Sequence, residues 1–178
     1  MKLVTFEVRT PLGRQRRLGA LLDGHQDGRI ADVTLAYAAY LREETDEPTP
    51  DELAQLRTPP DMIGWLRGEH RSREAAEQAL RYASARLAKG DAHGPQGEQL
   101  VFQRSEIRLL APLPRPNTFR DFSVFEEHGT HPEDGSMRRK APHWYRWPPY
   151  YKASPESIYG PEDSIPYVYY TRKLDLEP

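Results

Sequence analysis

Proline is the residue that most constrains how this chain can fold, because 17 of its 178 residues are proline. Each proline fixes a backbone φ angle and removes an amide donor, so we expect many extended segments and turns. The chain is also poor in apolar residues, with 37% hydrophobic residues and a mean hydropathy of -0.83. A core this lean often needs a partner surface. We expect that surface to come from the remainder of a domain or from another subunit.

Charge and composition exclude several classes of protein. A formal net charge of -2 and a pI near 6.3 give no reason to expect nucleic acid or a membrane as a partner. The absence of cysteine excludes disulfides and thiolate chemistry. The sequence has no apolar run long enough to cross a bilayer, and the charges in residues 1–8 argue against a signal peptide. We therefore expect a soluble, cytoplasmic protein.

The amino-terminal part predicts a small β-meander followed by helices. Apolar residues alternate along residues 2–8, and residues 17–22 and 28–33 are typical of two further strands. Asp32, Thr49 and Asp61 each stand where a helix-capping residue is expected. Residues 72–87 carry aliphatic side chains at helical spacing, with Ser72 at the start and Gly90 as the stop. This order of elements predicts an α+β fold.

A loop rich in glycine separates the amino-terminal part from the rest of the chain. Residues 91–97 contain two glycines and a proline, and strand-like residues resume at 99–103 and 106–110. We therefore divide the chain into an amino-terminal α+β domain, residues 1–95, and the beginning of a second domain, residues 96–178.

Residues 120–128 hold the most informative polar pair. Asp121 and His128 are seven positions apart, so a helical segment would place both on one face, although about 10 Å apart along the axis. We therefore expect the two side chains to border a site rather than to bond to each other. The alternative is an ordinary amphipathic helix that Asp121 caps and whose end His128 stabilises.

The last residues offer a second carboxylate. Residues 167–176 predict a strand that would bring Glu177 into place, with Asp175 on the same face. A carboxylate delivered beside Asp121 would suit a hard divalent cation, which prefers oxygen ligands.

Aromatic residues are concentrated in residues 143–152. They can form the wall of a ligand pocket or a core or subunit-interface strip, because aromatic enrichment marks both. A nucleic-acid platform is the weaker third interpretation, since few basic residues lie nearby.

Taken together, these segments resemble the fumarylacetoacetate hydrolase family. The resemblance rests on Asp121-Phe122 with His128, on the preceding prolines of residues 112–116, on Trp144 with residues 148–152, and on residues 174–177. It implies an amino-terminal domain followed by the first part of a mixed, mainly β catalytic domain that holds Mg²⁺ or Ca²⁺. The implied activity is metal-dependent hydrolysis of a carbon-carbon bond in a β-diketo acid or acylpyruvate, as in the degradation of aromatic compounds.

The same resemblance implies roles for four residues. Asp121 and Glu177 correspond to metal ligands, His128 to the histidine that helps to activate water, and Tyr151 to a tyrosine that contacts substrate. Ser123 stands where the founding enzyme has a tyrosine, so the exact substrate stays open. The family also includes decarboxylases, hydratases, isomerases and lyases.

The second glutamate of the family's metal pair and the ligands beyond it have no counterpart in residues 1–178. We therefore expect a truncated portion of an enzyme that binds metal poorly and is inactive alone. Its expected partners are a small dicarbonyl or keto-acid substrate and either a second copy in a homodimer or a complementing carboxy-terminal segment. The alternative is a non-catalytic interaction module that uses its aromatic strip as the contact surface.

Overall fold

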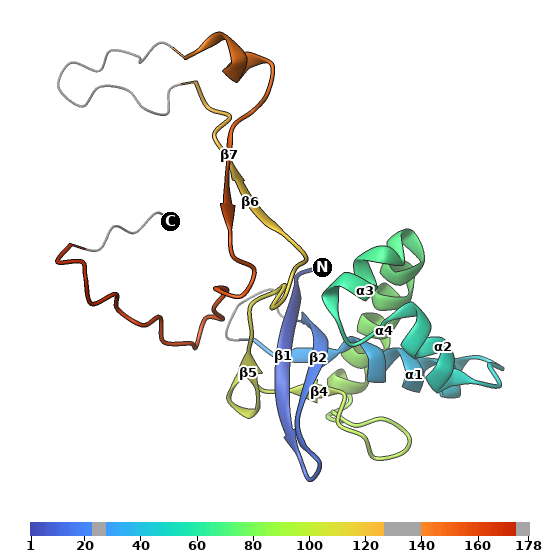
Figure 1. Ribbon diagram of the computed structural model, residues 1–178. Helices are drawn as coiled ribbons and strands as arrows, with labels where there is room; N and C mark the ends of the chain where they lie inside the picture. The colour runs from blue at the N-terminus through green and yellow to red at the C-terminus, as the bar shows by residue number, and fades with distance from the viewer. Residues whose placement is uncertain (23–27, 127–139, 174–178) are drawn as a thin grey trace. The chain divides into compact units, whose positions relative to one another are not determined.

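The computed structural model describes residues 1–22, 28–126 and 140–173. These residues form two compact units, one from the described residues of 1–114 and 159–173 and the other from those of 115–158. The first unit contains a five-stranded antiparallel sheet and four helices, and the second contains a two-stranded sheet. The predicted α+β class is therefore confirmed (Figure 1).

The larger sheet has the strand order β4-β3-β2-β1-β5. The predicted meander supplies its centre and is confirmed. Two short strands from beyond residue 100 complete its edges, so residues 101–109 belong to the same sheet as the amino terminus. The strands are β1 (Leu3–Thr10), β2 (Gly13–Leu21), β3 (Ile30–Asp32), β4 (Val101–Phe102) and β5 (Arg108–Leu109).

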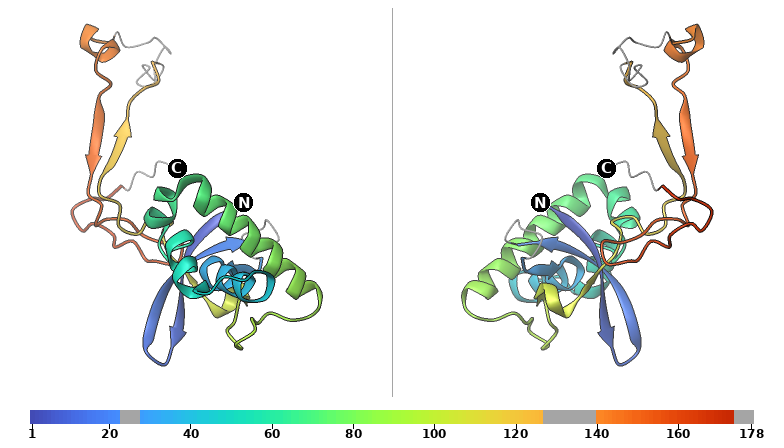
Figure 2. Two further views of the ribbon diagram at one scale, coloured as in Figure 1. Left: turned by 90° about the vertical axis from the view of Figure 1, so that its right-hand side faces the viewer. Right: turned by 90° about the vertical axis from the view of Figure 1, so that its left-hand side faces the viewer.

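The strand register gives the sheet two apolar faces. Leu18, Ala20 and Ala31 belong to the cluster that packs against the helices, which Figures 1 and 2 show gathered beside the sheet. Residues of opposite parity form a second cluster, in which the rings of Phe6 and Phe102 lie 5.7 Å apart although β1 and β4 are not neighbours. The curl of the sheet brings these rings together. The second cluster consists of Phe6, Val8, Ile30, Phe102 and Ile107.

Capping signals correctly located three helix starts. Asp32 accepts a hydrogen bond from the Leu35 amide at 2.9 Å, and Asp61 accepts one from the Gly64 amide at 2.7 Å. Thr49 precedes a helix but does not cap it with its side chain, because its hydroxyl donates to Glu47 instead. The helices are α1 (Val33–Glu44), α2 (Pro50–Arg57), α3 (Met62–Arg67) and α4 (Glu69–Ala88).

The start predicted for the longest helix was wrong by one turn. Helix α4 begins at Glu69, after Gly68, and Ser72 lies buried inside it. Gly68 sits so close to Ser72 that a Cβ on Gly68 would lie 1.8 Å from the Ser72 hydroxyl oxygen. The tight junction between α3 and α4 therefore replaces the expected serine cap. No helix in the described ranges is long and apolar enough to traverse a lipid bilayer.

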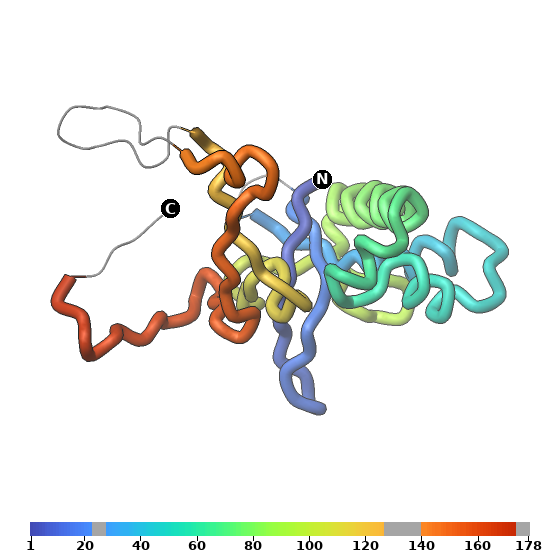
Figure 3. Tube along the Cα trace, turned by 45° about the horizontal axis from the view of Figure 1, so that its top comes forward, coloured from blue at the N-terminus to red at the C-terminus, as the bar shows by residue number. Residues whose placement is uncertain are grey.

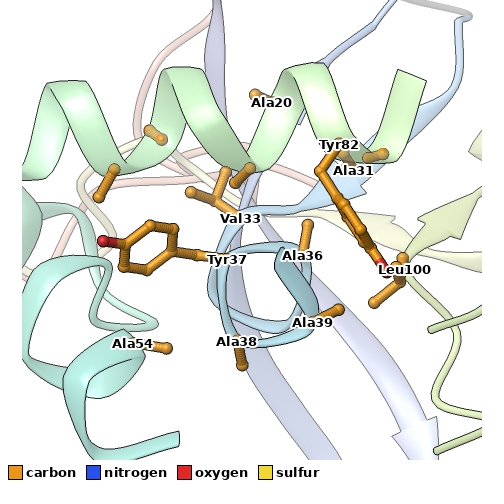
Figure 4. Packing of buried hydrophobic residues seen from close by; sticks show 14 of the residues in the cluster. Ala20, Ala31, Val33, Ala36, Tyr37, Ala38, Ala39, Ala54, Tyr82 and Leu100 are labelled. Carbon is orange, nitrogen blue, oxygen red and sulfur yellow. The ribbon is translucent and has the colours of Figure 1, made fainter. Parts of the chain in front are cut away.

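Alanine forms the contact between α1 and α4, the two longest helices (Figure 4). Small side chains let two helices approach closely, and here they are fully or almost fully buried on both sides. The buried alanines are Ala36 and Ala39 of α1 and Ala75, Ala76, Ala79 and Ala83 of α4. A polar contact supplements them at one end, where the Tyr82 hydroxyl donates to Glu43 at 2.7 Å.

Ion pairs hold residues 159–163 to β5. Glu162 accepts hydrogen bonds from the Leu109 amide at 3.0 Å and from the Arg104 guanidinium at 2.5 Å. Asp163 accepts from the Gly160 amide at 2.7 Å and from Arg108. The Leu109 amide lowers the pKa of the Glu162 carboxyl most, and the Gly160 amide lowers that of Asp163 most, each with help from the facing arginine. The turn at residues 160–163 therefore serves as an anchor.

The alanine interface predicts that a larger side chain destabilises the protein on the buried side of α4 but not on its exposed side. Ala79→Leu inserts three carbons into a closed contact and should lower the free energy of unfolding by about 1–3 kcal/mol, measured by urea denaturation. Ala85→Leu makes the same change on the exposed side of α4 and should stay within about 0.5 kcal/mol of the wild type. Equal destabilisation by both variants would contradict the close packing of the two helices.

The anchor at residues 159–163 should be lost only in acid. Because folding lowers the pKa of both carboxyls, their stabilisation is present at neutral pH and disappears as the pH falls through the lowered values. The Gly160 amide resonance should therefore titrate with a midpoint below 3.8, the ordinary value for Asp163. NMR measures this directly, and Asp163→Asn should abolish the titration. A wild-type midpoint at or above 3.8 would show that the anchor is absent in solution.

Candidate functional site

A two-stranded ribbon carries the described residues of the predicted site. It pairs β6 (Phe119–Phe122) with β7 (Tyr150–Ala153) in antiparallel orientation. Prolines precede both strands, at 116 and at 148 and 149, and favour the extended backbone that leads into each. Aromatic residues, which suit a pleated strand, form much of the ribbon itself.

The helix predicted over residues 120–128 is wrong for its described part. Asp121 lies in β6, and residues 123–125 have no regular structure. The segment pairs with β7 instead, and the Ser123 amide extends the pairing by donating to the Pro149 carbonyl at 3.0 Å. Cross-strand bonding to a segment about 30 residues away thus replaces local helical bonding.

The register places Asp121 directly opposite Tyr151. Residues directly opposite each other in an antiparallel pair project their side chains to the same face of the sheet, with Cβ atoms about 5 Å apart. Both side chains are exposed, Tyr151 at 71%. Two of the four predicted site residues therefore share one face of the ribbon.

The opposite face of the ribbon combines aromatic rings with positive charge. The rings of Phe122 and Tyr150 are 5.2 Å apart, and the Arg120 guanidinium lies 5.3 Å from the centre of the Tyr150 ring. Such contacts add about 0.5–1.5 kcal/mol each to the pairing of the strands. They orient this face and leave Asp121 and Tyr151 free to meet a ligand on the other.

The aromatic segment before β7 continues the exposed surface. It contains a short 3-10 helix, Pro142–Tyr145, in which the rings of Trp144 and Tyr145 meet at 5.1 Å. The Tyr145 hydroxyl donates to Glu126, which ties this helix to the end of β6. Trp147 is 75% exposed. Both the pocket-wall and the interface interpretations of residues 143–152 therefore remain predictions.

The remaining two predicted site residues, His128 and Glu177, lie outside the described residues, as does Asp175. The strand predicted over residues 167–176 is wrong as far as residue 173, since that stretch contains turns and bends. Its residues are mostly exposed and pair with no strand of either sheet. We predicted that a catalytic domain begins at residue 96, and this boundary also stays a prediction.

The described carboxylates do not by themselves fit a complete site for Mg²⁺ or Ca²⁺. Within residues 1–22, 28–126 and 140–173, no group of three histidine, aspartate or glutamate side chains is arranged to hold a metal ion. Asp121 contributes one carboxylate, whereas a hard divalent ion takes about six oxygen ligands. What Asp121 and Tyr151 can do together is contact one polar ligand through an anionic acceptor and a phenolic hydroxyl.

The sequence analysis did not identify a group of three arginines that the fold brings together. Arg9, Arg14 and Arg108 line a hollow of about 400 Å³ beside β1, together with apolar side chains of the second core cluster. The signal was present in the sequence as two arginines flanking the turn between β1 and β2. Their meeting with Arg108 depends on a pairing across about 100 residues, which local patterns do not report.

Comparison with known proteins provides no match from which a family could be assigned. No protein-family model matches the chain, and no curated protein matches it.

Proposed function

We propose that this chain carries the first part of the active site of a metal-dependent hydrolase of the fumarylacetoacetate hydrolase family. The proposed reaction is hydrolysis of a carbon-carbon bond in a β-diketo acid or an acylpyruvate. Asp121 and Glu177 would be metal ligands, His128 would take a proton from water, and Tyr151 would contact the substrate.

The pairing of Asp121 with Tyr151 is the observation that carries the proposal. The two residues belong to motifs 30 positions apart, and the resemblance assigns both to one site from the sequence alone. A one-residue slip of either strand would turn one of the two side chains to the opposite face. Their presence on one face is therefore a specific arrangement that supports the proposal.

The chemistry of the residues agrees with these roles. A neutral imidazole accepts a proton near neutral pH, which suits His128 to activating water. The phenol of Tyr151 can donate a hydrogen bond to a substrate carboxylate or carbonyl oxygen. Asp121 and Glu177 offer oxygen donors, but two carboxylates are too few to hold the ion tightly. The proposal therefore includes further ligands from a complementing polypeptide segment.

One observation favours a second candidate, a non-catalytic interaction module. Large apolar side chains stand exposed along residues 119–125 and 145–151 of the second unit, and the most exposed of them is Trp147 at 75%. Contiguous exposed aromatic residues mark protein interfaces. This candidate predicts a surface for another protein without any preference for metal at Asp121.

Paramagnetic Mn²⁺, used in place of Mg²⁺, separates the two candidates. Mn²⁺ should selectively broaden the amide resonances of Asp121 and Tyr151 in the full chain, because the ion binds beside that carboxylate. Asp121→Asn should weaken this broadening by at least about tenfold in Mn²⁺ concentration. Glu156→Gln, which neutralises another exposed carboxylate of the same unit, should leave it unchanged. Broadening that ignores Asp121→Asn would favour the interaction module.

Turnover should be very low without a complementing segment. With Mg²⁺ alone, the chain should leave the ultraviolet absorbance of an acylpyruvate nearly constant, because too few oxygen ligands hold the ion. Efficient turnover by the chain alone, abolished by Asp121→Asn, would contradict the need for further ligands. Efficient turnover that survives Asp121→Asn would contradict the proposed site itself.

A further inference from the structure

The hollow beside β1 lies at an incompletely paired edge of the larger sheet. Strand β5 pairs with β1 at Phe6 and Glu7, so the last residues of β1 have no strand partner on that side. The hairpin of β1 and β2 extends beyond the helices at this end, as Figure 3 shows. The hollow has a volume of about 400 Å³, which is within the range of small-molecule sites.

Apolar side chains of the core form one wall of the hollow. Val8, Phe102 and Ile107 are at most 8% exposed and belong to the second core cluster. Because they are packed against Phe6 and Ile30, they present a fixed apolar surface. A compact hydrocarbon or aromatic group could lie against this wall.

Three arginines provide the charge: Arg108 is paired with Asp163 as well as Glu7, whereas Arg9 and Arg14 are less completely neutralised. Arg9 and Arg14 are directly opposite each other in the pairing of β1 with β2, an arrangement that is unfavourable for like charges. Glu7 is shared between Arg14, at 3.6 Å, and Arg108, at 3.4 Å. Arg9 forms no ion pair with another described residue. An added anion between Arg9 and Arg14 would relieve their mutual repulsion.

The acidic residues of the hollow are already engaged. Glu106 accepts hydrogen bonds from the Gln103 amide at 2.6 Å and from the Gln99 side chain at 3.2 Å. Glu7 is occupied by the two arginines. Both carboxylates therefore already have partners, and three arginines outnumber the two glutamates in the lining of the hollow.

The backbone adds one further donor. The Thr5 carbonyl accepts from the Leu110 amide on the β5 side of β1. Backbone groups of alternate residues in a strand point to the same side, so the amide of Arg9 also points toward β5, beyond the last paired residue. A carboxylate at this edge would meet two guanidinium groups and one backbone amide.

We infer that this hollow binds a small organic carboxylate with a compact apolar body. Arg9 and Arg14 hold the carboxylate, since a guanidinium presents two parallel donors to it. Val8, Phe102 and Ile107 contact the apolar body. The inference uses residues of the first unit alone and does not rest on the proposed hydrolase function.

Benzoate is the probe for this site, used with the full 178-residue chain labelled with ¹⁵N. Benzoate should cause saturable shifts of the amide resonances of Val8, Arg9, Phe102 and Ile107. Benzyl alcohol, its neutral analogue, should bind at least about tenfold more weakly because it lacks the charge. Inorganic phosphate, which lacks the apolar body, should also bind more weakly than benzoate.

The matched variants keep the test falsifiable. Arg9→Gln with Arg14→Gln changes two exposed side chains, so the fold should survive, and benzoate affinity should fall at least about tenfold. Arg16→Gln removes one positive charge from β2, the strand of Arg14, but outside the hollow, and should change affinity less than about twofold. Unchanged benzoate affinity in the double variant would overturn the inference. If benzyl alcohol bound as tightly as benzoate, the proposed role of charge would be wrong. If phosphate bound as tightly as benzoate, the proposed role of the apolar wall would be wrong.

Discussion

Apolar burial confined to one part of the chain is the constraint on which the rest of the structure depends. Every apolar side chain that is buried among the described residues lies between Phe6 and Ala111. This region contains both core clusters, the sheet and all four α-helices. Residues 159–163 are held to it by charged contacts through Arg104 and Arg108 rather than by an apolar core of their own. The buried apolar side chains are therefore unevenly distributed: the first unit has a normal core, and the second has almost none.

Local signals predicted the first unit well because its elements are fixed by neighbours in sequence. Asp32 and Asp61 cap helices that begin at the next residue, and alternation along β1 correctly indicated that Phe6 and Val8 are buried, although not Thr5. Prediction failed where another contact within a few residues competed with the expected cap. Glu47 takes the Thr49 hydroxyl, and the junction at Gly68 buries Ser72 in the interior of α4.

The residues proposed for the candidate site stay a prediction, and the local structure expected around Asp121 was wrong. The spacing of Asp121 and His128 suggested a helix, although this inference used two polar residues rather than a continuous apolar period. The more reliable signal was the pair of aromatic segments that follow prolines, which are typical of strands. Register across a hairpin with a long connection cannot be read from local spacing, because it depends on where two distant segments meet. The pairing of Asp121 with Tyr151 therefore emerged from the structure.

The ribbon also sets a physical condition on any catalytic role for these residues. An isolated two-stranded ribbon is at best marginally stable in water, and a catalytic group must be held within about 0.5 Å of its productive position. The rings of Phe122 and Tyr150 steady the strands, but both rings remain about half exposed. Since rigidity comes from packing, Asp121 and Tyr151 can reach catalytic precision when another surface covers these rings. A surface that covers the aromatic face would therefore steady the ribbon on whose other face Asp121 and Tyr151 lie.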